Sequence, residues 1–167
     1  MLGFNDWLVY SGTCSGRLWG NMYDFRSAYG TSLRTAYTFS ARDNFGDNAE
    51  QLCWIKNAME EYIKVRDYFS CDFYPLTSAG DSLDIWTAAR FDRPEQGDGI
   101  ILAFRRENSN YKTLSFEFEN AKQGADYIFT DADTKESFIL SAQEIKNGIE
   151  ITIPEKRKSK LIFYNCK

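Results

Sequence analysis

The second half of the chain alternates apolar and polar side chains with a period of two, and this pattern limits the fold more than any other feature. Apolar residues take every second position at 100, 102 and 104, again at 114, 116 and 118, and again at 149, 151 and 153. Successive side chains of a β-strand point to opposite faces, so each segment predicts a half-buried strand. Shorter candidate strands are Ile85–Phe91, Tyr127–Thr130, Ser137–Leu140 and Leu161–Tyr164.

Turn-forming residues separate these candidate strands. Pro94–Gly99 and Asn147-Gly148 are typical of tight turns between antiparallel strands. The basic run Lys156-Arg157-Lys158 is interpreted as a turn before the last strand, not as a docking surface. Short strands at this spacing predict an antiparallel β-sandwich.

Before about residue 70 the pattern is different. Leu52, Ile55, Met59 and Tyr62 are spaced as one face of a helix, with Ile63 beside them, and predict a helix over about 48–66 that Asp47 caps. Further upstream we expect a loop over Tyr23–Gly30 and a mixed loop with short elements around 33–39. The fold class is therefore α+β, with one region over 1–69 and an all-β domain over 70–167.

Composition excludes several classes of function. The net charge of −4 and the pI near 5.0 argue against nucleic-acid binding, which needs a Lys/Arg-rich face. The chain has no histidine, which excludes Ser-His and Cys-His hydrolase chemistry and leaves no plausible zinc ligand set, so no metal site is assigned. No run approaches the roughly 20 apolar residues of a membrane span. The four cysteines allow three pairings, and reduced thiols are the simpler interpretation.

Four segments carry a resemblance to a known family. Trp86–Arg106 is similar to the hairpin that opens the C-terminal β-domain of α-galactosidase-like (melibiase-type) glycoside hydrolases. Tyr23–Ser27 together with Leu33 resembles a segment near the closing strand of their TIM barrel. Glu61–Arg66 followed by Cys71–Leu76 resembles the passage from the last barrel helix into the β-domain, although Ile63 intervenes in the first motif and Cys71 replaces a glycine in the second.

The resemblance implies that the chain is the C-terminal part of such an enzyme. Residues 1–69 would be the last elements of a TIM barrel, and 70–167 the C-terminal sandwich that supports it. The longer enzyme would hydrolyse a terminal α-linked sugar with retention and without a cofactor, using two carboxylates that both precede this stretch. Carbohydrate would be its partner, through the barrel. The chain holds no Lys-Trp-Asp-like and no Arg-x-Asp-like motif, so no catalytic residue is assigned and the chain alone is expected to be inactive.

The carboxylates that are present have structural interpretations. Asp24 lies close to Arg26 in sequence, which indicates an ion pair or loop hydrogen bonds. Asp131 and Asp133 alternate as in a calcium loop, but further oxygen ligands and the required glycine are missing, so a β-turn is expected.

Three aromatic residues do not fit a regular core pattern. Trp7, Trp19 and Tyr23 lie in segments broken by glycine and serine, and we consider them as substrate-binding residues beside ordinary loop packing. A second hypothesis for the whole chain is a stand-alone carbohydrate-binding or interaction module. A barrel remnant should expose the apolar runs at 7–10 and 33–39, whereas a module should cover them. The sequence does not indicate a cellular location.

Overall fold

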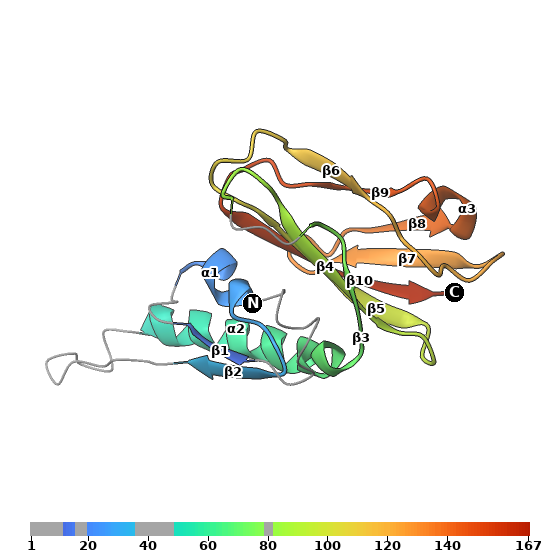
Figure 1. Ribbon diagram of the computed structural model, residues 1–167. Helices are drawn as coiled ribbons and strands as arrows, with labels where there is room; N and C mark the ends of the chain where they lie inside the picture. Colours follow the sequence, from blue (N-terminus) through green and yellow to red (C-terminus); the bar gives the residue numbers. More distant parts are fainter. Residues whose placement is uncertain (1–11, 16–19, 36–48, 79–81) are drawn as a thin grey trace, which may run out of the picture. The chain divides into compact units, whose positions relative to one another are not determined.

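The computed structural model describes residues 12–15, 20–35, 49–78 and 82–167 of the 167-residue chain (Figure 1). The chain divides into two compact units, Met1–Ser70 and Cys71–Lys167. No helix in the described ranges is long and apolar enough to cross a membrane.

The first unit alternates strands and helices. Its elements are β1 (Gly12–Ser15), α1 (Met22–Ser27), β2 (Ser32–Thr35), α2 (Ala49–Val65) and the 3-10 helix η3 (Arg66–Ser70). Strands β1 and β2 pair in parallel, with Gly12 opposite Ser32 and Ser15 opposite Thr35. The unit therefore has the order β-α-β-α with adjacent parallel strands.

Helix α1 corrects one prediction. The segment Tyr23–Gly30 was expected to be a loop, but Met22–Ser27 is helical because Asn21 caps it. The Asn21 Oδ1 atom accepts hydrogen bonds from the backbone N–H groups of Tyr23, at 3.0 Å, and Asp24, at 3.4 Å. Such a cap satisfies amides that a short helix otherwise leaves without partners.

Helix α2 confirms the predicted range and part of the predicted buried face. Ala58, Tyr62 and Val65 are buried, whereas Leu52 is 41% exposed and Ile63 53% exposed. Of the predicted face, Tyr62 is buried and Ile55 and Met59 are half-buried, whereas Ala58 and Val65 were not predicted to be buried. Asp47, the predicted cap, lies outside the described residues.

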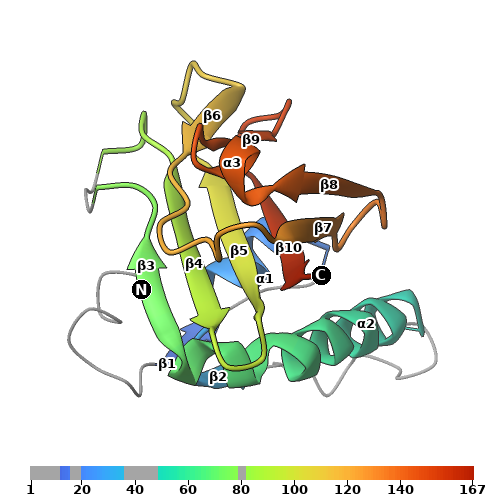
Figure 2. The same cartoon turned by 90° about the vertical axis from the view of Figure 1, so that its right-hand side faces the viewer.

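The second unit is an antiparallel β-sandwich, as predicted. Its elements are β3 (Asp72–Pro75), β4 (Thr87–Arg93), β5 (Asp98–Arg105), β6 (Thr113–Phe116), β7 (Asp126–Asp131), β8 (Ser137–Ser141), the one-turn helix α3 (Ala142–Ile145), β9 (Ile149–Thr152) and β10 (Lys158–Cys166). The larger sheet has the order β3-β4-β5-β10-β7-β8, and β6 pairs with β9 in the smaller one. Figures 1 and 2 show this smaller sheet lying over one face of the larger.

Two elements of this unit were not predicted. Strand β3 is short and pairs only with β4 in the described part of the chain, with Phe73 opposite Phe91. Helix α3 begins in a capping box, in which Ser141 and Glu144 each bond to the other's backbone N–H.

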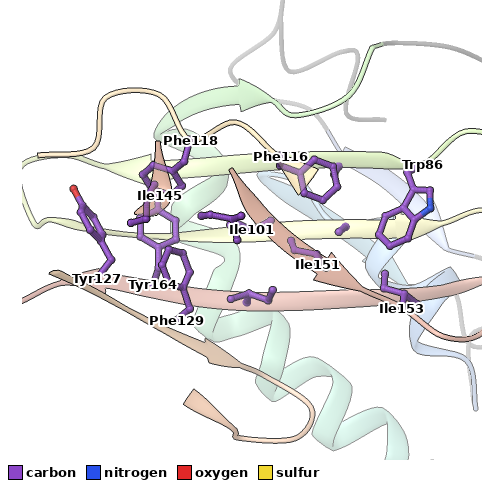
Figure 3. Packing of buried hydrophobic residues seen from close by; sticks show 14 residues of the cluster. Trp86, Ile101, Phe116, Phe118, Tyr127, Phe129, Ile145, Ile151, Ile153 and Tyr164 are labelled. Atoms are coloured by element: carbon purple, nitrogen blue, oxygen red, sulfur yellow. The ribbon is translucent and has the colours of Figure 1, made fainter. Parts of the chain in front are cut away.

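The core of the sandwich lies between its two sheets (Figure 3). The larger sheet contributes Ile101, Phe129 and Tyr164, and the smaller sheet contributes Phe116 and Ile151. Most of these side chains are less than 5% exposed. Burial of large apolar and aromatic groups is the main stabilising contribution in such a domain.

Strand β5 corrects the prediction of one buried face. Ile100, Leu102 and Phe104 are buried, but they lie on the face opposite Ile101 and Ala103, which belong to the core between the sheets. All residues of β5 except Asp98 are buried. A continuous run of apolar residues is typical of a strand that is covered on both faces. The predicted burial of Ile100, Leu102 and Phe104 is therefore confirmed, whereas the prediction of a half-buried strand is wrong.

Candidate functional site

The structure describes one of the three aromatic residues considered as substrate-binding. Trp7 and Trp19 lie outside the described residues. Tyr23 is partly buried in the first turn of α1, where its backbone N–H donates to Asn21. A role for these residues in binding a substrate therefore stays a prediction.

In the first unit, a buried ion pair joins α1 to α2. Arg26 is 1% exposed and donates from Nε and Nη2 to the two carboxylate oxygens of Glu61, at 2.8 and 2.7 Å. The Tyr29 hydroxyl donates to the same carboxylate at 2.8 Å. Burial, and then the charge of Glu61, raise the pKa of Tyr29 well above its usual range. An ion pair with these hydrogen bonds fixes the position of α1 against α2. It could not be predicted from the sequence because Arg26 and Glu61 are 35 residues apart.

In the second unit, a buried arginine lies between two aromatic rings. The Arg90 Cζ atom lies 4.2 Å from the centroid of the Tyr74 ring and 4.0 Å from that of Phe118. Arg90 is 1% exposed, and its Nη1 atom donates to the backbone carbonyl of Glu119 at 2.8 Å. The arginine thus connects β3 and β4 of the larger sheet to the segment that follows β6.

The rest of the guanidinium faces a tyrosine–aspartate pair. The Arg90 Nη2 atom lies 3.9 Å from an Asp92 carboxylate oxygen, and Nε and Nη2 have no hydrogen-bond partner in the described structure. The Tyr164 hydroxyl donates to Asp92 at 2.8 Å. Burial, and then the charge of Asp92, raise the pKa of Tyr164 well above its usual range. The four side chains Tyr74, Arg90, Asp92 and Tyr164 are here called the Arg90 cluster.

A cleft of about 480 Å³ lies beside this cluster. Arg90 and Tyr74 line it together with exposed Glu117 and Glu119, and its remaining lining residues are Pro75, Leu76, Ser115 and Phe116. These residues come from β3, β4 and the segment that begins with β6. The cleft could not be predicted from the sequence, because β3 was not predicted and the aromatic partners of Arg90, Tyr74 and Phe118, lie far from it along the chain.

The turn around Asp131 confirms the structural interpretation of that residue. Its carboxylate accepts hydrogen bonds from the backbone N–H groups of Asp133, at 2.8 Å, and Thr134, at 3.2 Å, and pairs with Lys160 at 2.9 Å. Burial acts to raise the pKa of Asp131, but the bonds from Lys160 and the two amides outweigh it and lower that pKa. In the described ranges, no three His, Cys, Asp or Glu side chains form a group that could hold a metal ion.

Comparisons with known proteins add to this geometry. No protein-family model matches the chain, and no curated protein matches it significantly by sequence. Fold and site together define a sandwich domain that follows a β-α-β-α unit.

Solved structures that superpose on the chain include α-galactosidases. The α-galactosidase of Lactobacillus brevis superposes with a TM-score of 0.65 at 15% identity, over 93% of this chain and 22% of that one. The GH36 α-galactosidase AgaB of Geobacillus stearothermophilus gives a TM-score of 0.64 at 13% identity, with the same coverage of 93% and 22%. AgaA of the same organism, solved with raffinose, gives 0.61 at 13% identity over 86% of this chain and 19% of that one.

The chain therefore has the fold of the C-terminal domain of these α-galactosidases and spans about a fifth of their length, 22% for the first. This confirms the resemblance noted in the sequence at the level of the fold.

Proposed function

We propose that the chain is the C-terminal part of an α-galactosidase-like glycoside hydrolase, in which the sandwich supports a catalytic barrel. Residues 1–69 would supply the last barrel elements and 70–167 the supporting domain. The longer enzyme would release a terminal α-linked galactose with retention, using two carboxylates that lie outside this stretch. No cofactor is needed for that reaction.

The β-α-β-α order of the first unit is the observation that carries this proposal. A TIM barrel consists of parallel strands, each followed by a helix. Strands β1 and β2 are parallel neighbours, α1 connects them and α2 follows, which fits two successive units of such a barrel. A pair of four-residue strands does not form a stable sheet by itself. In the longer enzyme, the other strands of the barrel would extend this two-stranded sheet.

The second apolar face of the larger sheet supports the same proposal. Ala89, Phe91, Ile100, Leu102 and Leu161 are all buried, yet none belongs to the core between the two sheets. A stand-alone sandwich usually presents polar residues on its outer faces. A sheet with two apolar faces instead fits a domain that packs against another layer.

Activity of the chain alone tests the absence of a catalytic pair. The purified 167-residue chain, produced in a host that lacks α-galactosidase, is expected to leave 4-nitrophenyl α-D-galactoside unhydrolysed. Turnover that persists in this host would contradict the proposal. The reading frame upstream gives an independent test, because it should encode a Lys-Trp-Asp-like and an Arg-x-Asp-like motif. An in-frame stop codon with no such motif would overturn the assignment to a longer enzyme.

A carbohydrate-binding role for the sandwich is a second candidate, which the cleft beside Arg90 favours. Two exposed carboxylates, Glu117 and Glu119, line the cleft, and a carboxylate can accept hydrogen bonds from sugar hydroxyl groups. Titration with raffinose, followed by protein NMR, should then shift signals of the cleft residues, and Glu119→Ala should weaken binding while exposed Glu107→Ala does not. An unchanged spectrum at high sugar concentration would exclude this role.

A further inference from the structure

Strand β8 is an edge strand with an exposed apolar surface. It lies at one end of the six-stranded sheet, and β7 is its only strand partner among the residues that the structure describes. Phe138 is 41% exposed and Ile139 is 55% exposed. Within the described ranges, no other two consecutive large hydrophobic residues are both exposed.

The residues of the strand itself provide none of the usual protections against pairing, and the Glu144 carboxylate covers only its Ser141 end. Proteins that keep a sheet edge free place charged residues, proline or bulges along it. Ser137–Ser141 reads Ser-Phe-Ile-Leu-Ser and contains no charge, no proline and no glycine. Its register with β7 is continuous from Ser137 to Ser141. The strand is therefore open to a further strand along its outer side.

Its backbone direction identifies the groups that a further strand would meet. The N–H of Asp131 donates to the carbonyl of Glu136, and residues of an antiparallel pair alternate between bonding toward and away from their neighbour. Ser137, Ile139 and Ser141 therefore direct their backbone groups outward. The Ser141 N–H already donates to the Glu144 carboxylate, and the Ser141 carbonyl, as the N-cap of α3, accepts the first hydrogen bond of that helix. The backbone groups of Ser137 and Ile139 remain for a further strand.

The sequence of the strand is symmetric about Ile139 in residue type. Phe138 and Leu140 flank Ile139 with large apolar groups, and Ser137 and Ser141 follow with small polar ones. An antiparallel copy placed on a two-fold axis at Ile139 would set Phe138 opposite Leu140 and Ser137 opposite Ser141. Such a contact is self-complementary, as a two-fold interface between identical subunits must be.

We propose that β8 pairs with β8 of a second copy of this chain, antiparallel and centred on Ile139. The two Ile139 residues exchange backbone hydrogen bonds across the two-fold axis. The two larger sheets then form one continuous sheet. The inference rests on the second unit alone and does not depend on the proposed enzymatic function. A short edge contact buries less than the roughly 1,600 Å² of a standard interface, so the dimer should dissociate in the micromolar range or above, about 10 μM to 1 mM.

Sedimentation equilibrium of the full chain tests the pairing. The chain should approach dimer mass as its concentration rises from about 10 μM to about 1 mM, and Ile139→Lys should remain monomeric because it places two like charges together at the axis. The matched control is Ile63→Lys on α2, where the isoleucine is 53% exposed, and it should associate like the wild type. Circular dichroism verifies that both variants fold. A monomer at every concentration, or equal association of Ile139→Lys, would overturn the proposal.

A cross-link tests the register. In the proposed pairing Ile139→Cys brings two thiols together at the axis, so mild oxidation should give a disulfide between the two copies of residue 139, identified by peptide mass spectrometry against the background of the chain's own cysteines. Ser137→Cys places its two thiols about 13 Å apart, four residues along an extended strand, and should not cross-link. Equal cross-linking of the two variants, or none for Ile139→Cys, would contradict this register.

Discussion

Tyr164 of β10 lies directly opposite Gly99 of β5, and its hydroxyl occupies the space that a Cβ atom on Gly99 would need. From that position the hydroxyl reaches Asp92 on β4, at 2.8 Å. The glycine thus allows a buried tyrosine to cross β5 and connect three strands of the larger sheet. The Arg90 cluster depends on this arrangement because Asp92 is its acidic member.

Gly99→Ala is therefore expected to destabilise the sandwich strongly. The added methyl group would meet both the Tyr164 ring and the backbone carbonyl of Phe91, and the cost should be about 2–4 kcal/mol in urea unfolding. Gly124→Ala is the control, because Gly124 has open space around it and only a φ of +77° to oppose a side chain. That variant should lose about 1 kcal/mol. Equal losses for the two variants would contradict the role of Gly99.

The raised pKa of Tyr164 should make the stability of the fold depend on pH above pH 10. The folded state raises the pKa of Tyr164 above its unfolded value of 10.0, so the stability that this group contributes is complete below pH 10 and is lost as the pH rises further. The slope should be about 1.4 kcal/mol per pH unit for one proton. Tyr164→Phe should lose about 1 kcal/mol at pH 7 and decline less steeply above pH 10. The midpoints of urea unfolding from pH 7 to pH 11 measure both effects. Tyr111→Phe is the control, because Tyr111 is 69% exposed. An unchanged slope for Tyr164→Phe would contradict this assignment.

Arg90→Lys should destabilise the second unit although it retains the positive charge. The ammonium group of lysine is not planar and cannot stack between the Tyr74 and Phe118 rings as the guanidinium does. The hydrogen bond from Arg90 Nη1 to the Glu119 carbonyl would also be lost. We expect a loss of about 2–3 kcal/mol in urea unfolding. Arg66→Lys is the matched control, since the Arg66 side chain is 56% exposed and pairs with Asp67 at the surface. That change should have an effect of less than about 0.5 kcal/mol. If Arg90→Lys left the free energy of unfolding unchanged, the positive charge alone would account for the contribution of Arg90.

Glu61→Gln should loosen the first unit selectively. The substitution keeps the shape of the side chain but leaves Arg26, which is 1% exposed, without a charged partner. Removing one member of a buried pair costs about 3 kcal/mol. Amide hydrogen exchange should accelerate in α1 and α2 and remain unchanged in the sandwich. Exposed Glu60→Gln on the same helix should leave exchange in both units unchanged. If amide exchange accelerated equally in both units, the Arg26–Glu61 pair would not stabilise the first unit selectively.

Much of the secondary structure could be predicted from the sequence, because it depends on local periodicity. The hairpin from Trp86 to Arg106, the strands of the sandwich and the extent of α2 all follow from residue spacing and turn chemistry. Elements without a clear periodic pattern could not be predicted. Helix α3 has four residues, which is too few to show a helical repeat, and strand β3 reads Asp-Phe-Tyr-Pro, in which apolar and polar residues do not alternate.

Faces and buried charges could not be predicted in the same way. Period-two spacing separates Ile100 and Leu102 from Ile101 and Ala103, but it does not say which pair meets the second sheet when both sides are apolar. Likewise, the helical pattern of α2 placed Tyr62 correctly on the buried face but also included Leu52, with Ile63 beside it, and both are exposed. Hydrophobicity alone gives no reason to turn Glu61 toward a neighbour.

The sequence by itself determined the class of fold, the division near residue 70 and the family that the chain resembles. Only the tertiary structure decided that β10 lies between β5 and β7, that Arg26 and Arg90 are buried, and that β3 and β6 border a cleft. The physical reason is range. Backbone geometry and side-chain alternation act over a few residues, whereas a buried arginine is tolerated only when partners far along the chain arrive to satisfy it.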